Sequence, residues 1–248
     1  MCLRVLTFLT SIRPCTWVVC LPLPPNLRFI WEALQERDAQ KRRAILYKLF
    51  AGCAATADFP RHLVLEDLIE MYPDARIVLN VHKGGGVDGG GGAGEEWSAS
   101  VKARIAPFMS WQYRVAGFWS VPDQWHRLCL VQWQRFVREK FRVETVWSKD
   151  LYDMHNQWVL DVCRRRGKDV LVWDSSMGWA PLCDFLGRKE PEVGIPMTDT
   201  EQEEIKGVVQ RRMRVGLKLW MRKVVVPMAI SVLGGWAIER ALSLRLPV

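Results

Sequence analysis

The sequence lacks the patterns by which several common classes of protein are recognised. None of its seven cysteines form a C-x-x-C pair, and no Cys/His spacing matches a zinc site. We therefore expect no metal, no disulfide framework, and a reducing, intracellular compartment, the cytoplasm. No Gly-Lys-Ser or Gly-Lys-Thr follows a glycine-rich turn, so a Walker phosphate loop is absent and a nucleotide hydrolase is disfavoured.

Acidic residues are outnumbered by basic ones, 27 to 35, which gives a net charge of +8. Such a surplus favours anionic partners: phosphorylated cofactors, nucleic acid or acidic lipid. We expect no nucleic acid, because the thirteen tryptophans lie at helical spacing among apolar residues, as in a core rather than a stacking platform. The 248 residues suit one large domain with tails.

Two short apolar runs interrupt an otherwise helical pattern. RIVLNV, residues 76–81, and DVLVW, residues 169–173, are continuously apolar rather than alternating. Continuous runs of this kind are typical of parallel strands that are covered on both faces. We expect an α/β fold in which a parallel sheet and its flanking helices form three layers.

The chain is expected to divide into three parts. Residues 1–27 form an irregular or degenerate segment, for which a signal peptide is the alternative. Residues 28–200 form the α/β domain, and 201–248 form an amphipathic helix with an apolar tail. Residues 224–238 are uncharged and would span about 22 Å as a helix, short of a ~30 Å hydrocarbon core. This tail is either a buried terminal helix or a membrane contact through residues 211–238, with its basic flank facing anionic lipid.

A glycine tract follows the first apolar run. Eight of the eleven residues from 84 to 94 are glycine. A dinucleotide G-x-G-x-x-G can be found in any polyglycine, so that match carries no information. Fixing so many glycines in one phosphate cradle would cost much conformational entropy. We predict a flexible insertion between the run that ends at Val81 and the helical run that begins at Glu95.

With the insertion removed, RIVLNVHK joins EEWSASVKARI as a strand, a short turn and a helix. Three further segments accompany this unit along the chain: WEAL…LYKLFAGCAATADFP (31–60), YDMHNQWV (152–159) and DVLVWDSSMGWAPLCDFLGRKEPEVGIP (169–196). In their motifs and in their order, the four segments resemble the fungal sulfotransferase-like family, a branch of the P-loop-type sulfotransferase fold. The resemblance implies transfer of a sulfuryl group from 3′-phosphoadenosine 5′-phosphosulfate (PAPS) to a small-molecule hydroxyl or amine.

The resemblance also implies roles for particular residues. In this family an Arg and a Ser of the strand–helix unit bind the 3′-phosphate, and the matching positions here are His82 and Ser100. Cytosolic sulfotransferases take their base from a His-x-Pro element, and Asp58 of ADFP stands at the similar position; capping of the helix after Pro60 is its alternative. His155 of YDMHNQWV either lines the acceptor pocket or hydrogen-bonds within the fold.

The family's first strand and glycine-rich loop, which hold the 5′-phosphosulfate, have no full counterpart. LRVLTFL runs into TSIRPCTWVV, which keeps an Arg and a Thr but has no glycine to turn successive N–H groups toward a phosphate. We expect this first unit to be degraded. The alternative function is a non-catalytic, membrane-associated member that keeps the scaffold but not the cofactor site. The basic stretch 164–168 either reaches a phosphate or forms a solvated turn. The sequence assigns no oligomeric state.

Overall fold

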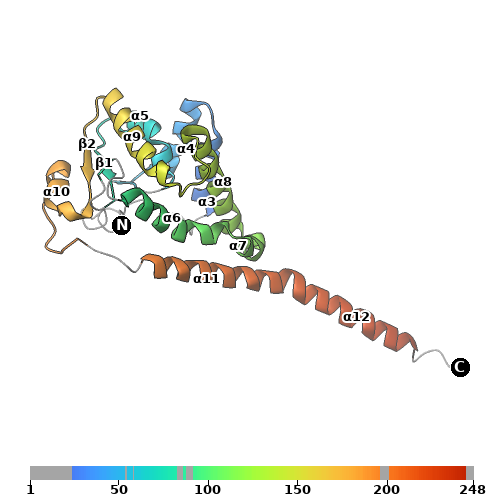
Figure 1. The fold of residues 1–248 in the computed structure, drawn as a ribbon. Helices are drawn as coiled ribbons and strands as arrows, with labels where there is room; N and C mark the ends of the chain where they lie inside the picture. The colour runs from blue at the N-terminus through green and yellow to red at the C-terminus, as the bar shows by residue number, and fades with distance from the viewer. Residues whose placement is uncertain are drawn as a thin grey trace.

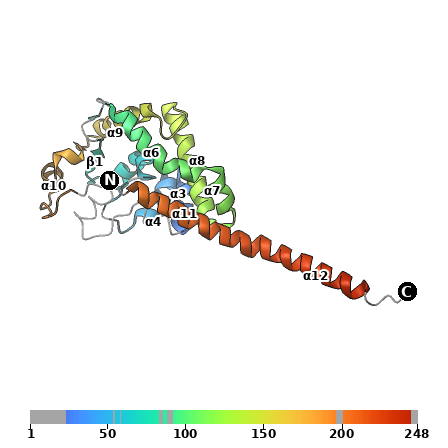
Figure 2. The same ribbon diagram turned by 60° about the horizontal axis from the view of Figure 1, so that its bottom comes forward.

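The computed structural model shows a helical body from which one long helix projects (Figure 1). The outer part of this helix, residues 226–243, stays clear of the body when the molecule is turned, whereas the inner part, residues 201–220, runs along it (Figure 2). Most of the segment 1–27, including the expected degenerate strand–loop unit, lies outside the part of the chain that the structure describes. That part consists of residues 24–53, 55–57, 59–82, 86–87, 92–195 and 201–243.

Helices account for most of the described chain. Short 3-10 turns, η1 (Arg61–Leu63), η3 (Gly117–Trp119) and η4 (Ser175–Met177), connect some of them, and a π-helical turn, η5 (Met221–Val225), lies within the projecting helix. The α-helices are α3 (Pro24–Gln35), α4 (Ala39–Phe50), α5 (Leu65–Met71), α6 (Ala93–Met109), α7 (Trp111–Ala116), α8 (Val121–Phe141), α9 (Lys149–Arg165), α10 (Ala180–Leu186), α11 (Glu201–Trp220) and α12 (Val226–Ser243).

Both predicted strands are present and pair with each other. β1 (Ile77–Asn80) and β2 (Val170–Trp173) are parallel, with Leu79 opposite Val172. A parallel pair needs a long crossover, and the helices from α6 to α9 supply it. The expectation of an α/β fold is confirmed in this coarse form. The wider parallel sheet of a three-layer P-loop fold is not present among the described residues, which are mostly helical and contain this two-stranded sheet.

Helices cover both faces of the small sheet, as the continuous apolar runs predict. Successive residues of a strand point to opposite faces. Leu79 accordingly packs with Val159 and Cys163 of α9, whereas Leu171 packs with Leu182 of α10. Figure 1 shows α9 and α10 on the two sides of the strands. A separate core lies between α3, α4 and α8, where residues spaced three or four apart are buried: Leu27, Ile30, Leu46, Leu49 and Cys129.

One boundary and one cysteine differ from the sequence-based expectation. Ala93 and Gly94 belong to the first turn of α6, so the helix begins inside the predicted insertion 84–94. Cys53 is disulfide-bonded, whereas the cysteine pattern predicted a reducing compartment without a disulfide framework. The other cysteines in the described ranges are buried free thiols: Cys129, Cys163 and Cys183.

A buried ion pair fixes α11 to the body. Arg212 of α11 donates from Nη1 to Oδ1 of Asp123 on α8 at 2.7 Å, and Tyr113 of α7 donates its hydroxyl to the same oxygen. The side chains of Arg212 and Asp123 are only 17% and 5% exposed. One turn further along, a Cβ at Gly216 would collide with the carbonyl oxygen of Ala116, so the two helices approach as closely as backbone allows.

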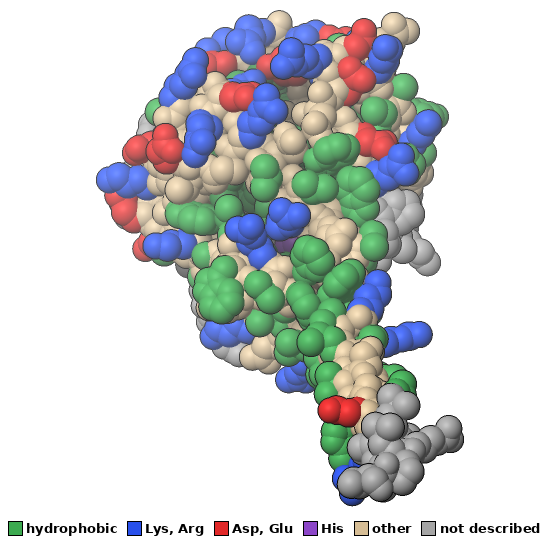
Figure 3. All heavy atoms as spheres, turned by 90° about the vertical axis from the view of Figure 1, so that its right-hand side faces the viewer, with side chains coloured by type: hydrophobic (Ala, Val, Ile, Leu, Met, Phe, Trp, Pro, Cys, Tyr) green, Lys and Arg blue, Asp and Glu red, His purple; other side chains and the backbone are tan. Residues whose placement is uncertain are grey.

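Of the two alternatives for the C-terminal tail, burial within the protein does not agree with the structure. Beyond η5, apolar side chains of α12 are exposed, including Ile230 at 65% and Trp236 at 57%. Figure 3 shows this hydrophobic surface projecting from the body. Pro227 lies just after the π-helical turn. Proline cannot donate a helical hydrogen bond and its ring crowds the preceding turn, and the wider winding of the π-helical turn accommodates both.

Breaking the Arg212–Asp123 pair should destabilise the protein strongly. Arg212→Met leaves the Asp123 carboxylate buried without its cation, so we expect the free energy of unfolding to fall by about 3 to 5 kcal/mol in urea denaturation. Arg28→Met is the matched control, because the Arg28–Glu32 pair is exposed and should contribute less than about 0.5 kcal/mol. Equal effects of the two substitutions would contradict the assignment of this pair as the attachment of α11.

Two buried histidines should make the fold sensitive to acid. Burial lowers the pKa of His126 from 6.5 to about 3 and that of His155 from 6.5 to about 4. Between pH 6.5 and 4 the unfolded chain therefore binds two protons that the folded chain does not. We expect the free energy of unfolding to fall by about 2.7 kcal/mol per pH unit as the pH drops through this range. His155→Gln should halve that slope, and an unchanged slope would contradict the burial argument.

Candidate functional site

The end of β1 and the beginning of α6 lie against each other, although the glycine tract separates them in sequence. Val81 extends the ladder by donating its N–H to the carbonyl of Trp173 at 2.9 Å. Its side chain shares a buried cluster with Ala93 of α6. The next residue, His82, has Nδ1 3.5 Å from Oε2 of Glu96 on α6. The turn that the family resemblance requires is thus closed in space.

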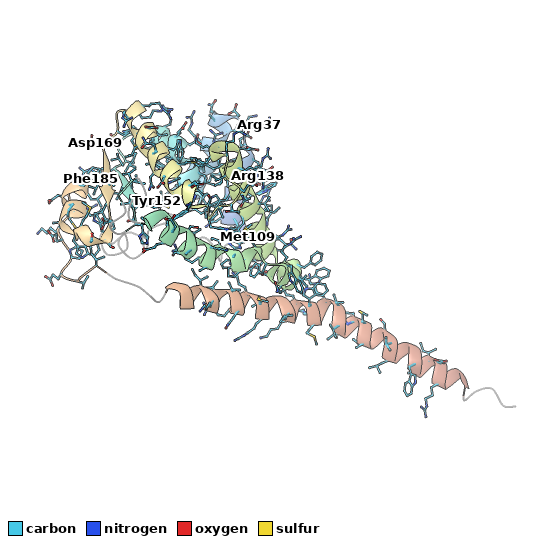
Figure 4. All side chains as sticks on the ribbon, viewed as in Figure 1. Arg37, Met109, Arg138, Tyr152, Asp169 and Phe185 are labelled. Carbon is cyan, nitrogen blue, oxygen red and sulfur yellow. The ribbon has the colours of Figure 1, made fainter. Side chains whose placement is uncertain are left out.

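The hydroxyl of Tyr152 holds the chain where it leaves β1. The N–H of His82 donates to this hydroxyl at 2.8 Å, and the hydroxyl donates to the carbonyl of Gly86 at 3.0 Å. Asn156, one turn along α9, donates to the carbonyl of Val87 at 3.5 Å. Figure 4 shows Tyr152 beside the beginning of α6, where its ring centroid lies 5.8 Å from that of Trp97. One face of α9 therefore fixes the backbone around the predicted phosphate-binding position.

Three polar side chains follow one another along α6. Glu96, Ser100 and Arg104 are four residues apart and so lie on one face of the helix. Arg104 folds back and donates from Nε to the carbonyl of Ser100 at 3.3 Å. Ser100 is partly buried between an acidic neighbour and a basic one. His82 and Ser100 both flank Glu96, which places an anion beside the two predicted phosphate ligands.

Asp58, the predicted base, lies outside the described residues. The residues that follow it are described and lead to α9. Phe59 is buried with its ring centroid 5.3 Å from that of Trp133, and His62 lies 5.7 Å from His155. His62, which lies just beyond the ADFP segment, is therefore a spatial neighbour of the YDMHN segment.

His155 has the environment of a packing residue. Its ring lies among His62, Phe141 and Trp158, with centroids 5.7 to 6.3 Å away. Burial lowers the pKa of His155 to about 4, so the imidazole is neutral near pH 7. Of the two alternatives for this residue, a place within the fold agrees with the structure. The residues of this segment that reach the loop after β1 are instead Tyr152 and Asn156, whose spacing of four gives them a common face.

The basic stretch 164–168 turns away from this site. Arg166 forms an ion pair with Glu70, and Arg165 lies 3.7 Å from Glu66, both on α5. Lys168 donates to the carbonyl of Pro73. These contacts join the end of α9 to α5. Of the two alternatives for the stretch, a turn on the surface agrees with the structure, and a phosphate contact does not.

The segment after β2, residues 174–195, packs onto the sheet. Trp179 and Cys183 share a buried cluster with Trp173 of β2. The indole N–H of Trp179 donates to the carbonyl of Val193 at 2.7 Å and holds down the loop after α10. Gly187 ends α10 with φ of 62°, a left-handed conformation that glycine adopts without strain. This unit follows the carboxyl end of β2, the same sheet edge at which His82 follows β1.

A surface hollow of about 520 Å³ lies on a different face of α6. Its lining includes Ser98, Lys102 and Lys149, and also Glu95 and Glu144. Residues 98 and 102 are rotated around the helix from Glu96 and Ser100, so the hollow is separate from the His82–Ser100 face.

Comparison with known proteins identifies the family. The family described as "Sulfotransferase domain" matches residues 11–204, and the chain belongs to that family. The chain is also similar to "Ava biosynthesis cluster protein M" of Aspergillus versicolor, with 23% identity over 161 residues. That similarity covers 61% of this chain and 56% of the relative, so the chain spans little more than half of the relative's length.

The family match begins earlier than the sequence analysis expected. It starts at residue 11 rather than near residue 28, and it therefore includes TSIRPCTWVV for the most part. Residues 11–27 of the N-terminal segment therefore lie within the matched region.

Removing the hydroxyl of Tyr152 should loosen the chain after β1. Tyr152→Phe leaves the N–H of His82 and the carbonyl of Gly86 without this partner, so we expect a loss of about 1 to 3 kcal/mol of stability. Backbone amides near His82 should exchange faster with deuterium in the variant. Tyr47→Phe, at a residue 62% exposed, should change neither quantity measurably. Unchanged exchange near His82 would contradict the role given to Tyr152.

Proposed function

We propose that this chain is a sulfotransferase-like protein that transfers a sulfuryl group from PAPS to a small-molecule hydroxyl or amine. One observation carries the proposal: in a member of the sulfotransferase domain family, the end of β1 with His82 lies directly against α6, which bears Ser100. The imidazole of His82 and the hydroxyl of Ser100 would then hold the 3′-phosphate of the donor.

The charges at this position fit a phosphate only in part. His82 replaces the family's Arg, which offers a permanent, forked contact to phosphate oxygens. The Glu96 carboxylate, 3.5 Å from His82, repels an incoming anion. Its side chain is 69% exposed, so it is free to turn into solvent. Arg104, one turn beyond Ser100, would supply a permanent positive charge near the phosphate and offset part of this repulsion.

The donor would supply the activated sulfuryl group, and the protein would position it and accept a proton. Sulfuryl transfer needs an acceptor group that is deprotonated as it attacks. We retain Asp58 for this step, because it directly precedes Phe59, which packs against Trp133 of α8, and comes shortly before His62, which lies against His155 of α9. An aspartate would serve as the base near neutral pH if partial burial raised its pKa.

A second function is favoured by the same acidic neighbour. The carboxylate of Glu96 beside His82, together with the absence of the family's Arg, suits a non-catalytic member that keeps the scaffold but has lost donor binding. Binding of the donor product, 3′-phosphoadenosine 5′-phosphate, separates the two functions.

Calorimetric titration with 3′-phosphoadenosine 5′-phosphate should detect binding, and binding should raise the melting temperature. Glu96→Gln and His82→Arg should each tighten binding, by about tenfold for the latter, because they remove repulsion and add a forked cation. Ser100→Ala should weaken it about tenfold by removing a hydrogen bond to a charged group. Lys102→Ala, on the other face of α6, is the matched control and should have little effect.

Adenosine 5′-phosphate, which lacks the 3′-phosphate, should bind much more weakly. If neither the unaltered protein nor His82→Arg gives heat or thermal stabilisation with 3′-phosphoadenosine 5′-phosphate, the non-catalytic function is correct and the proposed one is wrong.

A further inference from the structure

The helix α12 is apolar around its whole circumference. At about 100° per residue, its large apolar side chains point in all directions around the axis. A helix on the surface of a soluble protein has one apolar stripe, whereas a helix that is apolar all round is surrounded by apolar material. Seven such side chains are 47% to 69% exposed: Val226, Met228, Ile230, Val232, Leu233, Trp236 and Ile238.

The charges along this stretch are all of one sign until its far end. Between Ile205 and Ile238 the sequence has seven Lys and Arg residues and no Asp or Glu. The basic residues stop at Lys223, and the next charge is Glu239. Among the described residues, one helical stretch, Ile205–Arg240, is long and apolar enough to cross a membrane, and its apolar window is 0% buried. A cationic stretch followed by an apolar helix is complementary to an anionic membrane surface and its interior.

Aromatic and basic side chains meet where the long helix leaves the body. We call Phe118, Trp119, Trp220 and Lys223 the collar. The ring of Trp119 lies 5.0 Å from that of Phe118 and 5.8 Å from that of Trp220, and the Nζ of Lys223 lies 5.0 Å from the Trp119 ring centroid. The indole N–H of Trp220 donates to the carbonyl of Val115 at 2.7 Å, which ties the collar to α7.

The collar continues into a hydrophobic surface on the body. Exposed apolar side chains of α7, η3 and the first turn of α8 accompany it, and Figure 3 shows hydrophobic side chains gathered at the end of the body from which the tail projects. Trp and Lys are the residues that occupy the boundary between membrane headgroups and hydrocarbon. The exposed residues in question are Trp111 at 68%, Val115 at 52%, Phe118 at 56% and Val121 at 52%.

A second pairing of Trp with a cation marks the far end of α12. The guanidinium of Arg240 lies 5.2 Å from the ring centroid of Trp236. Trp220 and Trp236 are sixteen residues apart, which corresponds to about 24 Å along a helix. This length is close to the ~27 Å hydrocarbon thickness of the thinner intracellular membranes.

We propose that α12 inserts into a lipid bilayer with anionic headgroups and that the collar seats the body on its surface. A second copy of the chain would cover one stripe of α12, whereas a bilayer covers every side. The Arg212–Asp123 pair fixes α11 to the body, so the collar and the helix approach the membrane as one unit. This inference does not rest on the proposed sulfotransferase function.

Insertion is tested with the full chain synthesised in the presence of vesicles. Phosphatidylcholine vesicles with and without phosphatidylserine are floated on a density gradient and then washed with high salt and alkaline carbonate. We expect the protein to float, more so with phosphatidylserine, and to resist both washes. Leu233→Arg, at the centre of the apolar segment, should reduce the floated fraction by about a hundredfold. Val193→Arg, at an exposed apolar residue remote from α12, is the matched control and should float normally.

Three outcomes would overturn the insertion. Release by high salt would show an electrostatic surface contact without insertion. Normal flotation of Leu233→Arg would show that α12 is not the inserted element. A stable dimer that does not float would show that a second copy covers α12.

Seating of the collar is tested separately by hydrogen exchange on vesicles and in detergent micelles. We expect amides of residues 111–121 to exchange at least fivefold more slowly on anionic vesicles, while those of α5, on another part of the body, do not change. Protection confined to α12 would contradict the collar and leave a body that is merely tethered.

Discussion

The structure around the candidate site depends on one hydroxyl group. Tyr152 accepts the N–H of His82 and donates to the carbonyl of Gly86, so a single side chain of α9 satisfies backbone on both sides of residues 83–85. A buried backbone group without a hydrogen-bond partner lowers the stability of the fold. Where the chain leaves β1, the Tyr152 hydroxyl therefore replaces the hydrogen bonds of the strand ladder. A long insertion is then tolerated, because its ends are held and longer loops add little further entropy cost.

The same arrangement explains how the site keeps its geometry while its chemistry changes. The position of His82 is set by the backbone of β1 and by Tyr152, and that of Ser100 by the rigid helix α6. Neither placement depends on which side chain binds phosphate. An Arg can therefore become His, and an acid can appear at Glu96, without loss of the fold. The family scaffold and the affinity for a phosphorylated donor are separable properties, and only the first is secured by packing.

Much of the fold could be predicted from the sequence because its signals are local. The continuous apolar runs predicted two parallel strands. The exposure of α12 could not be decided, since an apolar helix suits a core and a membrane equally well until its neighbours are known. The Arg212–Asp123 pair joins residues 89 apart, and nothing in either local sequence marks the other.

Within the candidate site the sequence left two alternatives for His155, and burial of its ring agrees with a place within the fold. The contacts of Tyr152 with the chain after β1 could not be foreseen, because a tyrosine on a helix carries no local sign of its partner. The contact between His82 and Glu96 could not be predicted either, because an acid in the first turn of a helix is sufficiently explained by the helix dipole. Only the distance of 3.5 Å between the two side chains reveals that Glu96 would compete with a phosphate for His82.

The central claim is that the junction of β1 and α6 receives the 3′-phosphate of an adenosine nucleotide. A structure of the protein bound to 3′-phosphoadenosine 5′-phosphate tests it most directly. The account predicts the 3′-phosphate within hydrogen-bonding distance of the imidazole of His82 and the hydroxyl of Ser100, with Glu96 turned into solvent. A nucleotide whose 3′-phosphate lies instead in the hollow beside Lys102 and Lys149 would contradict it.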